Sequence, residues 1–539
     1  MSRQFSRREM LRFSAVAAGG AAALGSGALS LTGCSTNRPL TSPASFSAGP
    51  PPGGTPRRGG TLRVGMISGG NGETLDLRKI TTAGDISRSS ALYDPLWFVG
   101  EYGAVIPGLA ESWDSNDKSD LWTIRLRQGV QFHNGKPLTA ADVVYTIQNS
   151  WLSPDGSLQP VLSQLIDGPN VRTDGPMTVV IPLKRPLAQF PTLASVQNCY
   201  IVPQGFTSWD KPIGTGPFVF KSFTPGQRSE FTANDHYWRG AGRPPVDSLV
   251  IDSSFVTDET RLNALLGSSI DIMPSIQPAL GRANEASGRI YLGNQPGPGW
   301  SGACYRVDQG PFADPRVRQA VKLSANRQAA ADLLFSGYAV AGNDCVGYTD
   351  QYFADDLKSE YDPEKAKSLL KSAGYDGLSF DLTTTSLGAT TNPLATLFKE
   401  QAKAAGININ VNQIDPAIYF TKEAGFQTRP WSMELWTNAV SSLTLFYLFF
   451  LVDGAPYQDS FFGNPEHDAQ IFAAMAEKDD ARAKQKWHDV QVVQHEQGGT
   501  INFVNYNWID GYGLNLRGAK TTNAGPCDNF DFSTTWLEG

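Results

Sequence analysis

Residues 122–147, WTIRLRQGVQFHNGKPLTAADVVYTI, contain a strand, a turn and a helix in direct succession. Apolar side chains at positions 122, 124 and 126 alternate with polar ones, which is typical of a half-buried strand. A polar turn, His133–Lys136, follows the strand. Thr139 and Asp142 then have the spacing of a capping box ahead of an apolar helical face. This order predicts a protein of the α/β or α+β class.

The second half of the chain repeats this pattern. We expect helices to begin at Asp314-Pro315, Asp362-Pro363 and Asn392-Pro393, because Asp or Asn caps free N–H groups and proline fits the first turn. Gly374 and Gly406 suit left-handed ends for the last two helices. Alternating apolar residues before and after the third helix predict a strand–helix–strand unit with parallel strands.

The N-terminus has the composition of an export signal. Arg7 and Arg8 precede a long uncharged stretch rich in alanine, glycine and leucine, which resembles a twin-arginine signal. A membrane-spanning anchor is the alternative, but the stretch is only weakly apolar. Leu31-Thr32-Gly33-Cys34 looks like a bacterial lipobox, so we expect lipidation at Cys34. The Ser-, Pro- and Gly-rich residues that follow predict a flexible tether.

Composition limits the kind of partner. The 539 residues carry a net charge of −7 with no long basic run, which argues against a nucleic-acid partner. After lipidation four cysteines remain, at 199, 304, 345 and 527, in a chain that leaves the reducing cytoplasm. A disulfide between Cys304 and Cys345 is our preferred pairing, and free buried thiols are the alternative.

Several strings occur in the order found in one family. They include PGLAESW from Pro107, residues 122–147 themselves, IGTGPF from Ile213, PFADPRVRQAV from Pro311 and YDPEKAKSLLKSAGY from Tyr361. Together they resemble the family 5 extracellular solute-binding proteins, which are the peptide/nickel-type receptors of ABC importers. The resemblance covers roughly residues 60 to 535. Most of these residues also have a purely structural interpretation as turn, cap or core positions.

The resemblance implies an α/β, two-lobed, periplasmic-binding-protein-like fold (type II, cluster C-like) with an extra subdomain in lobe I. A small ligand, which is peptide-like, N-blocked, a sugar or another solute, would be enclosed between the lobes and delivered to the permease subunits of an ABC importer. We expect an extracytoplasmic monomer, attached to the cell membrane by its lipid, without cofactor or metal. The expected organisation is a signal at 1–33, a tether at 34–58, lobe I at 59–295 with its extra subdomain at about 100–230, lobe II at 296–499, and a return to lobe I at 500–539.

In peptide-binding relatives one strand of lobe II carries an aromatic residue and an aspartate that contact the ligand. The matching string here is MELWTNA from Met433. Trp436 fits the aromatic role, the main chains of Leu435 and Thr437 could pair with an extended ligand, and Asn438 follows them. Ala439 replaces the aspartate, so a ligand with a free ammonium group would lack its partner. We therefore predict an uncharged or N-blocked ligand.

Three further residues are candidates for ligand contact. Trp300 and Arg306 flank the expected crossover between lobes, where an arginine could hold a carboxylate or phosphate. A structural ion pair is the alternative for Arg306. Tyr506 matches a late aromatic segment that can line the cleft. The apolar run from Leu443 to Phe450 is either a core helix or an apolar wall of the pocket.

The residue inventory does not favour catalysis. None of the five histidines belongs to HExxH or to a clustered metal-ligand pattern, and GxSxG and phosphate-loop motifs are absent from the sequence. We therefore predict no enzyme activity. A secreted hydrolase with distant paired carboxylates and a surface co-receptor for signalling remain the alternatives.

Overall fold

The structure is a computed structural model that describes residues 47–51, 53–240, 242–285, 287–386, 388–421, 423–436 and 442–538. The predicted signal segment and Cys34 lie outside these residues. No helix among them is long and apolar enough to cross a membrane.

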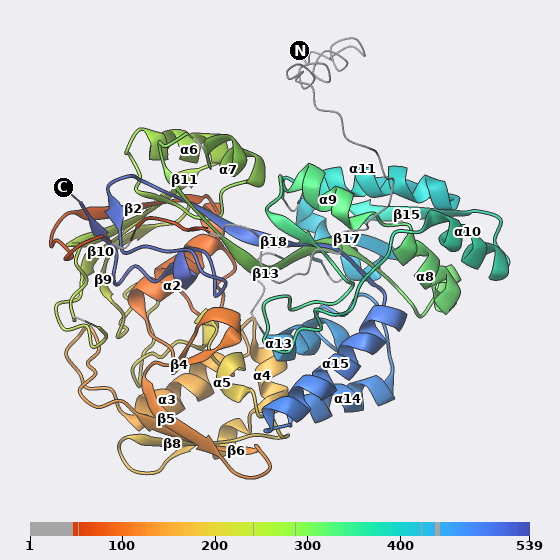
Figure 1. Cartoon of the computed structure of the whole chain (residues 1–539). Coiled ribbons are helices and arrows are strands. Elements are labelled where there is room, and N and C mark those ends of the chain that lie inside the picture. Colours follow the sequence, from red (N-terminus) through yellow and green to blue (C-terminus); the bar gives the residue numbers. More distant parts are fainter. Residues whose placement is uncertain are drawn as a thin grey trace, which may run out of the picture. The chain divides into compact units, whose positions relative to one another are not determined.

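A 12-stranded mixed sheet forms the centre of the protein (Figure 1). Two small strands pair at its side, β1 (Ser47–Ala48) with β13 and β14 (Ala339–Ala341) with β18. The main strand order is β16 (Ile407–Gln413), β15 (Leu378–Thr384), β17 (Trp431–Trp436), β13 (Tyr291–Tyr305), β18 (Thr500–Tyr512), β12 (Ile272–Met273), β2 (Thr61–Ile67), β11 (Ser248–Phe255), β10 (Arg228–Ala233) and β9 (Phe218–Thr224).

The antiparallel strands β13 and β18 join the two halves of this sheet and cross the middle of the molecule in Figure 1. Their ladder shifts register between Pro296 and Trp300, so Gly297 to Gly299 are skipped. A side chain at Gly299 would lie 2.4 Å from the ring of Tyr506. Glycine is therefore required where the two long strands pass each other at this interruption.

Helices cover both halves of the sheet. Asp314 and Asp362 cap α8 and α10 by accepting from the N–H groups of Arg316 and Lys365, as predicted. β15, α11 and β16 form the predicted parallel strand–helix–strand unit. The helices are α2 (Ala83–Leu92), α6 (Asp258–Leu266), α7 (Pro278–Glu285), α8 (Pro315–Leu323), α9 (Arg327–Leu334), α10 (Pro363–Ser372), α11 (Thr391–Ala402), α12 (Pro416–Tyr419) and α16 (Cys527–Phe530).

One predicted helix start is wrong by two residues. α11 begins at Thr391 rather than at Pro393, and Thr390 rather than Asn392 occupies the N-cap position. The side-chain oxygen of Asn392 instead accepts from the hydroxyl of Thr384 at the end of β15, at 2.8 Å. The tertiary contact thus outweighs the local capping preference.

A second, smaller sheet contains the opening stretch of the sequence. Its strands are β5 (Ala110–Ser115), β6 (Leu121–Leu126), β8 (Thr178–Pro182) and β7 (Arg172–Thr173), beside the hairpin β3 (Trp97–Val99) and β4 (Val105–Pro107). Its apolar core is shared with a helical segment from the C-terminal half, which Figure 1 shows next to it. The small sheet brings α3 (Ala140–Thr146), α4 (Gln159–Leu165) and α5 (Phe190–Leu193) to this core. The C-terminal half contributes α13 (Leu443–Phe446), α14 (Pro465–Met475) and α15 (Asp480–Gln497).

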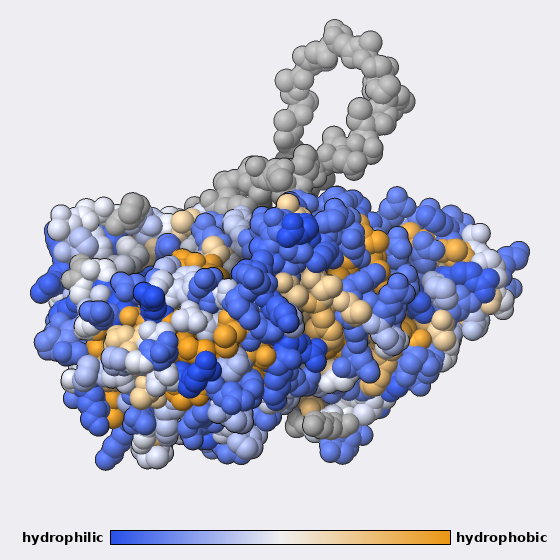
Figure 2. Space-filling model, turned by 90° about the horizontal axis from the view of Figure 1, so that it is seen from below, coloured by the Kyte–Doolittle hydropathy of each residue, from blue (hydrophilic) through white to orange (hydrophobic). Residues whose placement is uncertain are grey.

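The four cysteines at 199, 304, 345 and 527 are buried and free. The expected disulfide between Cys304 and Cys345 is therefore wrong. Cys304 lies in β13, whereas the thiol of Cys345 donates to the carbonyl of Gln491 on α15. On the face shown in Figure 2, hydrophilic residues predominate and apolar ones are exposed in patches.

Candidate ligand-binding site

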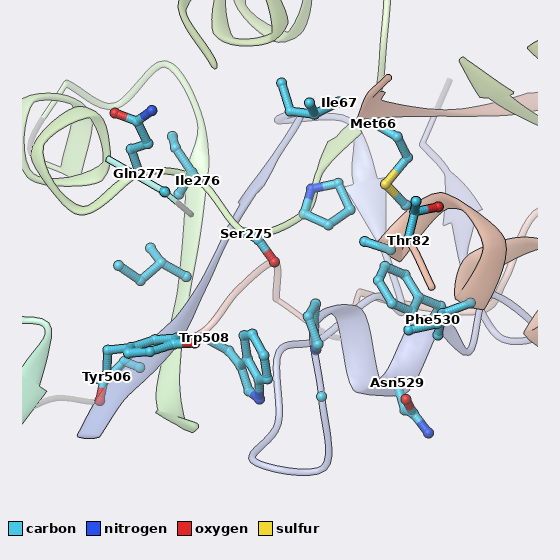
Figure 3. A pocket seen from close by; sticks show the side chains of 18 of the residues that line it. Met66, Ile67, Thr82, Ser275, Ile276, Gln277, Tyr506, Trp508, Asn529 and Phe530 are labelled. Carbon is cyan, nitrogen blue, oxygen red and sulfur yellow. The ribbon is translucent and has the colours of Figure 1, made fainter. Parts of the chain in front are cut away.

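A cavity of about 700 Å³ lies where the two halves of the sheet meet (Figure 3). Its walls come from segments far apart in the chain. They include Met66–Gly69, Thr81–Ala83, Ser195–Gln197, Pro274–Pro278, Gly388–Thr390, Leu435, Tyr506–Ile509 and Ala524–Pro526 with Asn529 and Phe530. A volume of this size suits a small organic solute.

The cavity carries no free charge among its described lining residues. Its charged side chains are Asp258 and Arg261, which form an ion pair and are both buried. The Arg261 guanidinium also donates to the carbonyl of Pro274 at 2.9 Å. Since these groups satisfy each other, neither offers a counter-charge to a ligand. The described wall therefore presents no unpaired charged side chain to the cavity.

Aromatic rings form one wall. The ring of Tyr506 stacks on Phe335 with centroids 5.9 Å apart and meets Trp508 edge-on at 6.3 Å. Its hydroxyl donates to the carbonyl of Trp436 at 2.7 Å, which links β18 to β17. Burial raises the pKa of Tyr506. The hydroxyl consequently stays protonated and this wall is neutral and apolar.

The opposite wall contains a strained turn. Cys527, Asp528, Asn529 and Phe530 have φ angles of 49°, 56°, 59° and 61°, which L-residues adopt rarely. The Cys527 N–H donates to Asp510 at 2.8 Å, and the Asn529 side chain accepts from Gln197 at 2.7 Å. Such strain is concentrated at ligand sites. The turn presents Asn529 and Phe530 to the cavity (Figure 3).

The predicted site residues lie in different places. Leu435 and Tyr506 line the cavity. The ring of Trp436 lies instead in an aromatic cluster, 4.5 Å from Phe450 and 5.9 Å from Tyr457. Thr437 and Asn438 lie outside the described residues. The ligand role of Trp436 stays a prediction, because its main chain is next to Leu435 while its ring does not line the cavity.

Trp300 and Arg306 do not line the cavity. Trp300 is buried in the apolar core, opposite Trp436 and Asn505 in the ladders. The Arg306 guanidinium donates to Asp308 at 2.6 Å and lies over the ring of Phe461. This arrangement matches the structural ion pair that the sequence left as the alternative for Arg306.

The run from Leu443 to Phe450 packs mainly in the core that contains the smaller sheet. It does not line the cavity, so the core-helix interpretation describes its position. Sequence reasoning missed most of the wall, including Pro274–Pro278 and the turn with Asn529 and Phe530. These are short loop segments without a periodic pattern, and tertiary structure alone brings them together.

The comparison with known families decides the identity. Residues 104–456, well over half of the chain, match "Bacterial extracellular solute-binding proteins, family 5 Middle". The chain is a family 5 extracellular solute-binding protein. This solute-binding protein is 26% identical to the glutathione-binding protein GsiB of Pectobacterium atrosepticum over 419 residues, 75% of this chain and 80% of GsiB. It is 30% identical to the dipeptide-binding protein of Escherichia coli over 338 residues, 57% of this chain and 62% of that protein.

Solved structures confirm the two-lobed periplasmic-binding-protein fold of this solute-binding protein. DppA of Helicobacter pylori, in complex with the peptide STSA, has a TM-score of 0.76 at 20% identity and covers 90% of this chain and 99% of its own. CtaP of Listeria monocytogenes, an ABC transporter substrate-binding protein, has a TM-score of 0.77 at 21% identity, covering 90% and 100%. The solute-binding protein therefore acts outside the cytoplasm for an ABC importer, and its family consists of binding proteins rather than enzymes.

Proposed function

We propose that this solute-binding protein is a lipoprotein, anchored through Cys34, that captures an uncharged or N-blocked peptide-like solute in the 700 Å³ cavity. The observation that carries the ligand class is the pairing of Asp258 with Arg261, which leaves no free charge among the described wall residues. An unblocked ammonium group would be enclosed there without a carboxylate, at a cost of about 3 to 5 kcal/mol.

The free edge of β17 supports a peptide-like shape for the ligand. β15 pairs with β17 only at Thr383 and Ser432, so from Met433 to Trp436 this edge has no strand partner among the described residues. Two of its carbonyls, those of Met433 and Trp436, accept from the hydroxyls of Tyr419 and Tyr506 instead. Leu435 lines the cavity on this stretch. An extended ligand could form main-chain hydrogen bonds there. A sugar without such a backbone would rely on the aromatic wall at Tyr506 and Trp508.

Native mass spectrometry of the freshly purified protein tests the ligand class first, because a co-purified solute reveals its mass. Calorimetric titration with a dipeptide and its N-acetylated form then tests the charge preference. We expect the blocked form to bind at least about tenfold more tightly, a difference of about 1.4 kcal/mol. Tight binding of the free dipeptide that acetylation abolishes would contradict the proposal.

A matched pair of variants links this preference to the cavity. Ile276→Asp places a carboxylate in the cavity wall and should reverse the preference toward the free amine. Val256→Asp, at a side chain that is 76% exposed, is the control and should leave the preference unchanged. Equal effects of the two substitutions would show that the cavity does not select the ligand.

The anchor is tested separately. Cys34→Ser should move the protein from the membrane fraction to the soluble fraction, because the acyl chains that hold it would be missing. Ser35→Ala is the neighbouring control. Light scattering of the released protein tests the expected monomer.

A further inference from the structure

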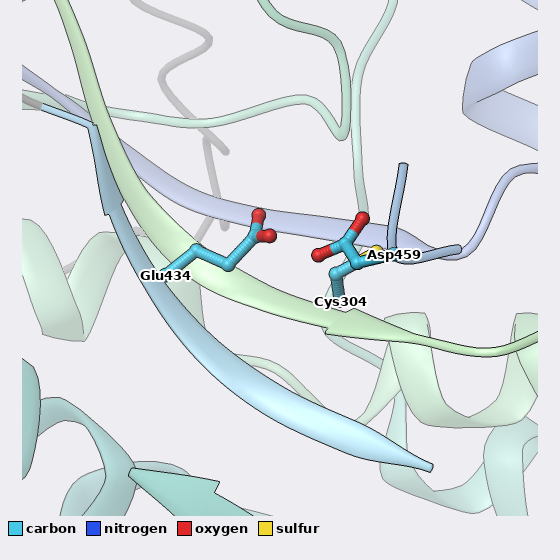
Figure 4. A group of neighbouring side chains, drawn as sticks. All are labelled: Cys304, Glu434 and Asp459. Atoms are coloured by element: carbon cyan, nitrogen blue, oxygen red, sulfur yellow. The ribbon is translucent and has the colours of Figure 1, made fainter. Parts of the chain in front are cut away.

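Three side chains that the ligand site does not use meet inside the protein (Figure 4). They are Cys304 on β13, Glu434 on β17 and Asp459 in the loop before α14. One ligating atom from each lies within 4.8 Å of the others. Their residues are 2%, 4% and 7% exposed, so the cluster is closed to bulk water.

The strand register explains how two of them meet. Cys304 is paired with Ser432 across the antiparallel ladder, and Glu434 lies two residues further along β17. Cys304 and Glu434 are therefore diagonal neighbours on one face of the sheet. Leu435 points to the opposite face and lines the ligand cavity. The sheet consequently separates the cluster from the ligand.

The third residue is held in place by the main chain of its loop. The N–H of Val307, just beyond β13, donates to the carbonyl of Ser460 at 2.8 Å. The Gln427 side chain donates to the carbonyl of Gln458 at 3.0 Å. Asp459 is thus fixed between two bonded neighbours, and Figure 4 shows its carboxylate directed toward Glu434.

The cluster lacks a counter-charge in the part of the chain that the structure describes. Glu434 Oε1 and Asp459 Oδ2 are buried and accept no hydrogen bond from any described residue. Among the described residues, no lysine, arginine or histidine forms an ion pair with either carboxylate. Burial, and then the charge of Asp459, raises the pKa of Glu434 and also that of the Cys304 thiol. Two carboxylates enclosed without a cation are strongly disfavoured unless a proton or a metal ion joins them.

We propose that Cys304, Glu434 and Asp459 form a structural site for a divalent cation of the zinc class. A thiolate with two carboxylates suits a borderline-soft ion, and three protein ligands leave one position for water or a main-chain oxygen. The ion would fasten β13, β17 and the loop of Asp459 together. The ligand proposal does not enter this inference, since the two sites lie on opposite faces of the sheet.

The sequence could not reveal this site. Positions 304, 434 and 459 have no ligand spacing and belong to three separate segments. Sequence analysis therefore predicted no metal. The pair His488 and His495, whose spacing places both on one face of a helix, is otherwise engaged: His488 contacts Asp356 at 3.0 Å and His495 contacts the carbonyl of Asn343 at 2.7 Å.

Metal content of the full chain is the first test. The protein is expressed with zinc in the medium, so that the ion is present while the chain folds, and is then dialysed extensively and analysed by plasma mass spectrometry. We expect about one zinc ion per chain. Cys304→Ala and Glu434→Gln should each retain less than a tenth of that amount. Cys345→Ala, which removes another buried thiol, is the matched control and should retain the metal.

Two further measurements distinguish a metal site from a shared proton. Cobalt refolded into the protein should give a thiolate-to-cobalt absorption band that Cys304→Ala lacks and Cys345→Ala keeps. A chelator present during refolding should lower the unfolding midpoint of the wild type but not that of Glu434→Gln. Metal-free wild type, no cobalt band and a midpoint that neither zinc nor chelator moves would overturn the proposal and show that the carboxyl groups share a proton. Ligand affinity is not a readout here, so this outcome says nothing against the ligand proposal.

Discussion

Two pairs of buried carboxylates differ in how their negative charge is compensated. Glu73 and Asp85 share the guanidinium of Arg88, which lies 3.2 Å and 2.7 Å from their oxygens. Both also accept main-chain N–H groups, Glu73 from Gly226 and Asp85 from Thr74. Glu434 and Asp459 are also buried but have no such cation among the described residues. The comparison shows that burial alone does not predict whether a carboxylate needs a bound ion. The presence or absence of a neighbouring positive side chain decides it.

The largest change in stability is expected when the cation of the Glu73–Asp85–Arg88 cluster is removed. Arg88→Leu leaves two enclosed carboxylates without a cation and should lower the free energy of unfolding by about 3 to 5 kcal/mol in urea denaturation. Arg482→Leu is the control, because its ion pair with Glu477 is at the surface and should contribute less than about 1 kcal/mol. Similar losses in both variants would remove the distinction between enclosed and exposed pairs.

Removal of a charge from the Cys304–Glu434–Asp459 cluster should raise the free energy of unfolding rather than lower it. In protein refolded with a chelator, Asp459→Asn removes an enclosed charge and should raise the free energy of unfolding by roughly 1 to 3 kcal/mol. Asp85→Asn, in the paired cluster, should lower it under the same conditions because Arg88 loses a partner. Destabilisation by both substitutions in metal-free protein would mean that Asp459 has a partner after all.

A third buried carboxylate, Asp350, has hydrogen-bond donors but no ion pair with a described residue, and its contribution to stability should depend on pH. Asp350 accepts the N–H groups of Tyr352 and Leu443 but forms no ion pair with any residue that the structure describes, and burial raises its pKa from 3.8 to about 6. The folded state therefore holds this proton more tightly than the unfolded state. Its contribution to stability should fall by roughly 3 kcal/mol in total as pH rises from below 3.8 through about 6, and it should level off about one pH unit above the folded pKa.

The difference in unfolding free energy between wild type and Asp350→Asn, measured across this pH range, checks the sign. Asp314→Asn provides the contrast, since the hydrogen bond from Arg316 lowers the pKa of Asp314. The stability contributed by Asp314 is present above the unfolded pKa and is lost as pH falls. The free energy of unfolding of the wild type minus that of Asp350→Asn should fall as pH rises. An increase of this difference with pH would refute the raised pKa of Asp350.

The smallest effect concerns Arg306. Arg306→Gln removes an exposed pair with Asp308 and should cost less than about 1 kcal/mol of stability. Affinity for the co-purified solute should not change, because Arg306 does not line the cavity. Leu435→Ala, which alters the wall, should weaken that affinity. A tenfold loss in Arg306→Gln would restore its predicted role as a ligand contact.

Much of the fold could be predicted because its signals are local. The alternation at positions 122 to 126, the capping pair Thr139 and Asp142, and the caps Asp314 and Asp362 all depend on neighbours in the chain. Asn392 shows the limit, since a hydroxyl from β15 engages the side chain that was expected to cap a helix. Local sequence preference predicts a helix start correctly unless a distant residue forms a hydrogen bond with the side chain that was expected to cap the helix.

Two of the residues predicted to contact the ligand, Leu435 and Tyr506, lie on strands and line the cavity. Their contact with a ligand stays a prediction. Alternation of side chains along β17 explains why Trp436, one position further, directs its ring elsewhere. The turn with Asn529 and Phe530 was missed because left-handed backbone angles in residues other than glycine leave no mark in the sequence.

The interrupted ladder at Gly297 to Gly299 has a mechanical consequence. Each long strand is stiff where its hydrogen bonds are continuous, so flexing is easiest at the gap between Pro296 and Trp300. The ring of Tyr506 covers this gap on one side and faces the cavity on the other. A solute resting on that ring would therefore lie against the point where the pairing of the two long strands is weakest.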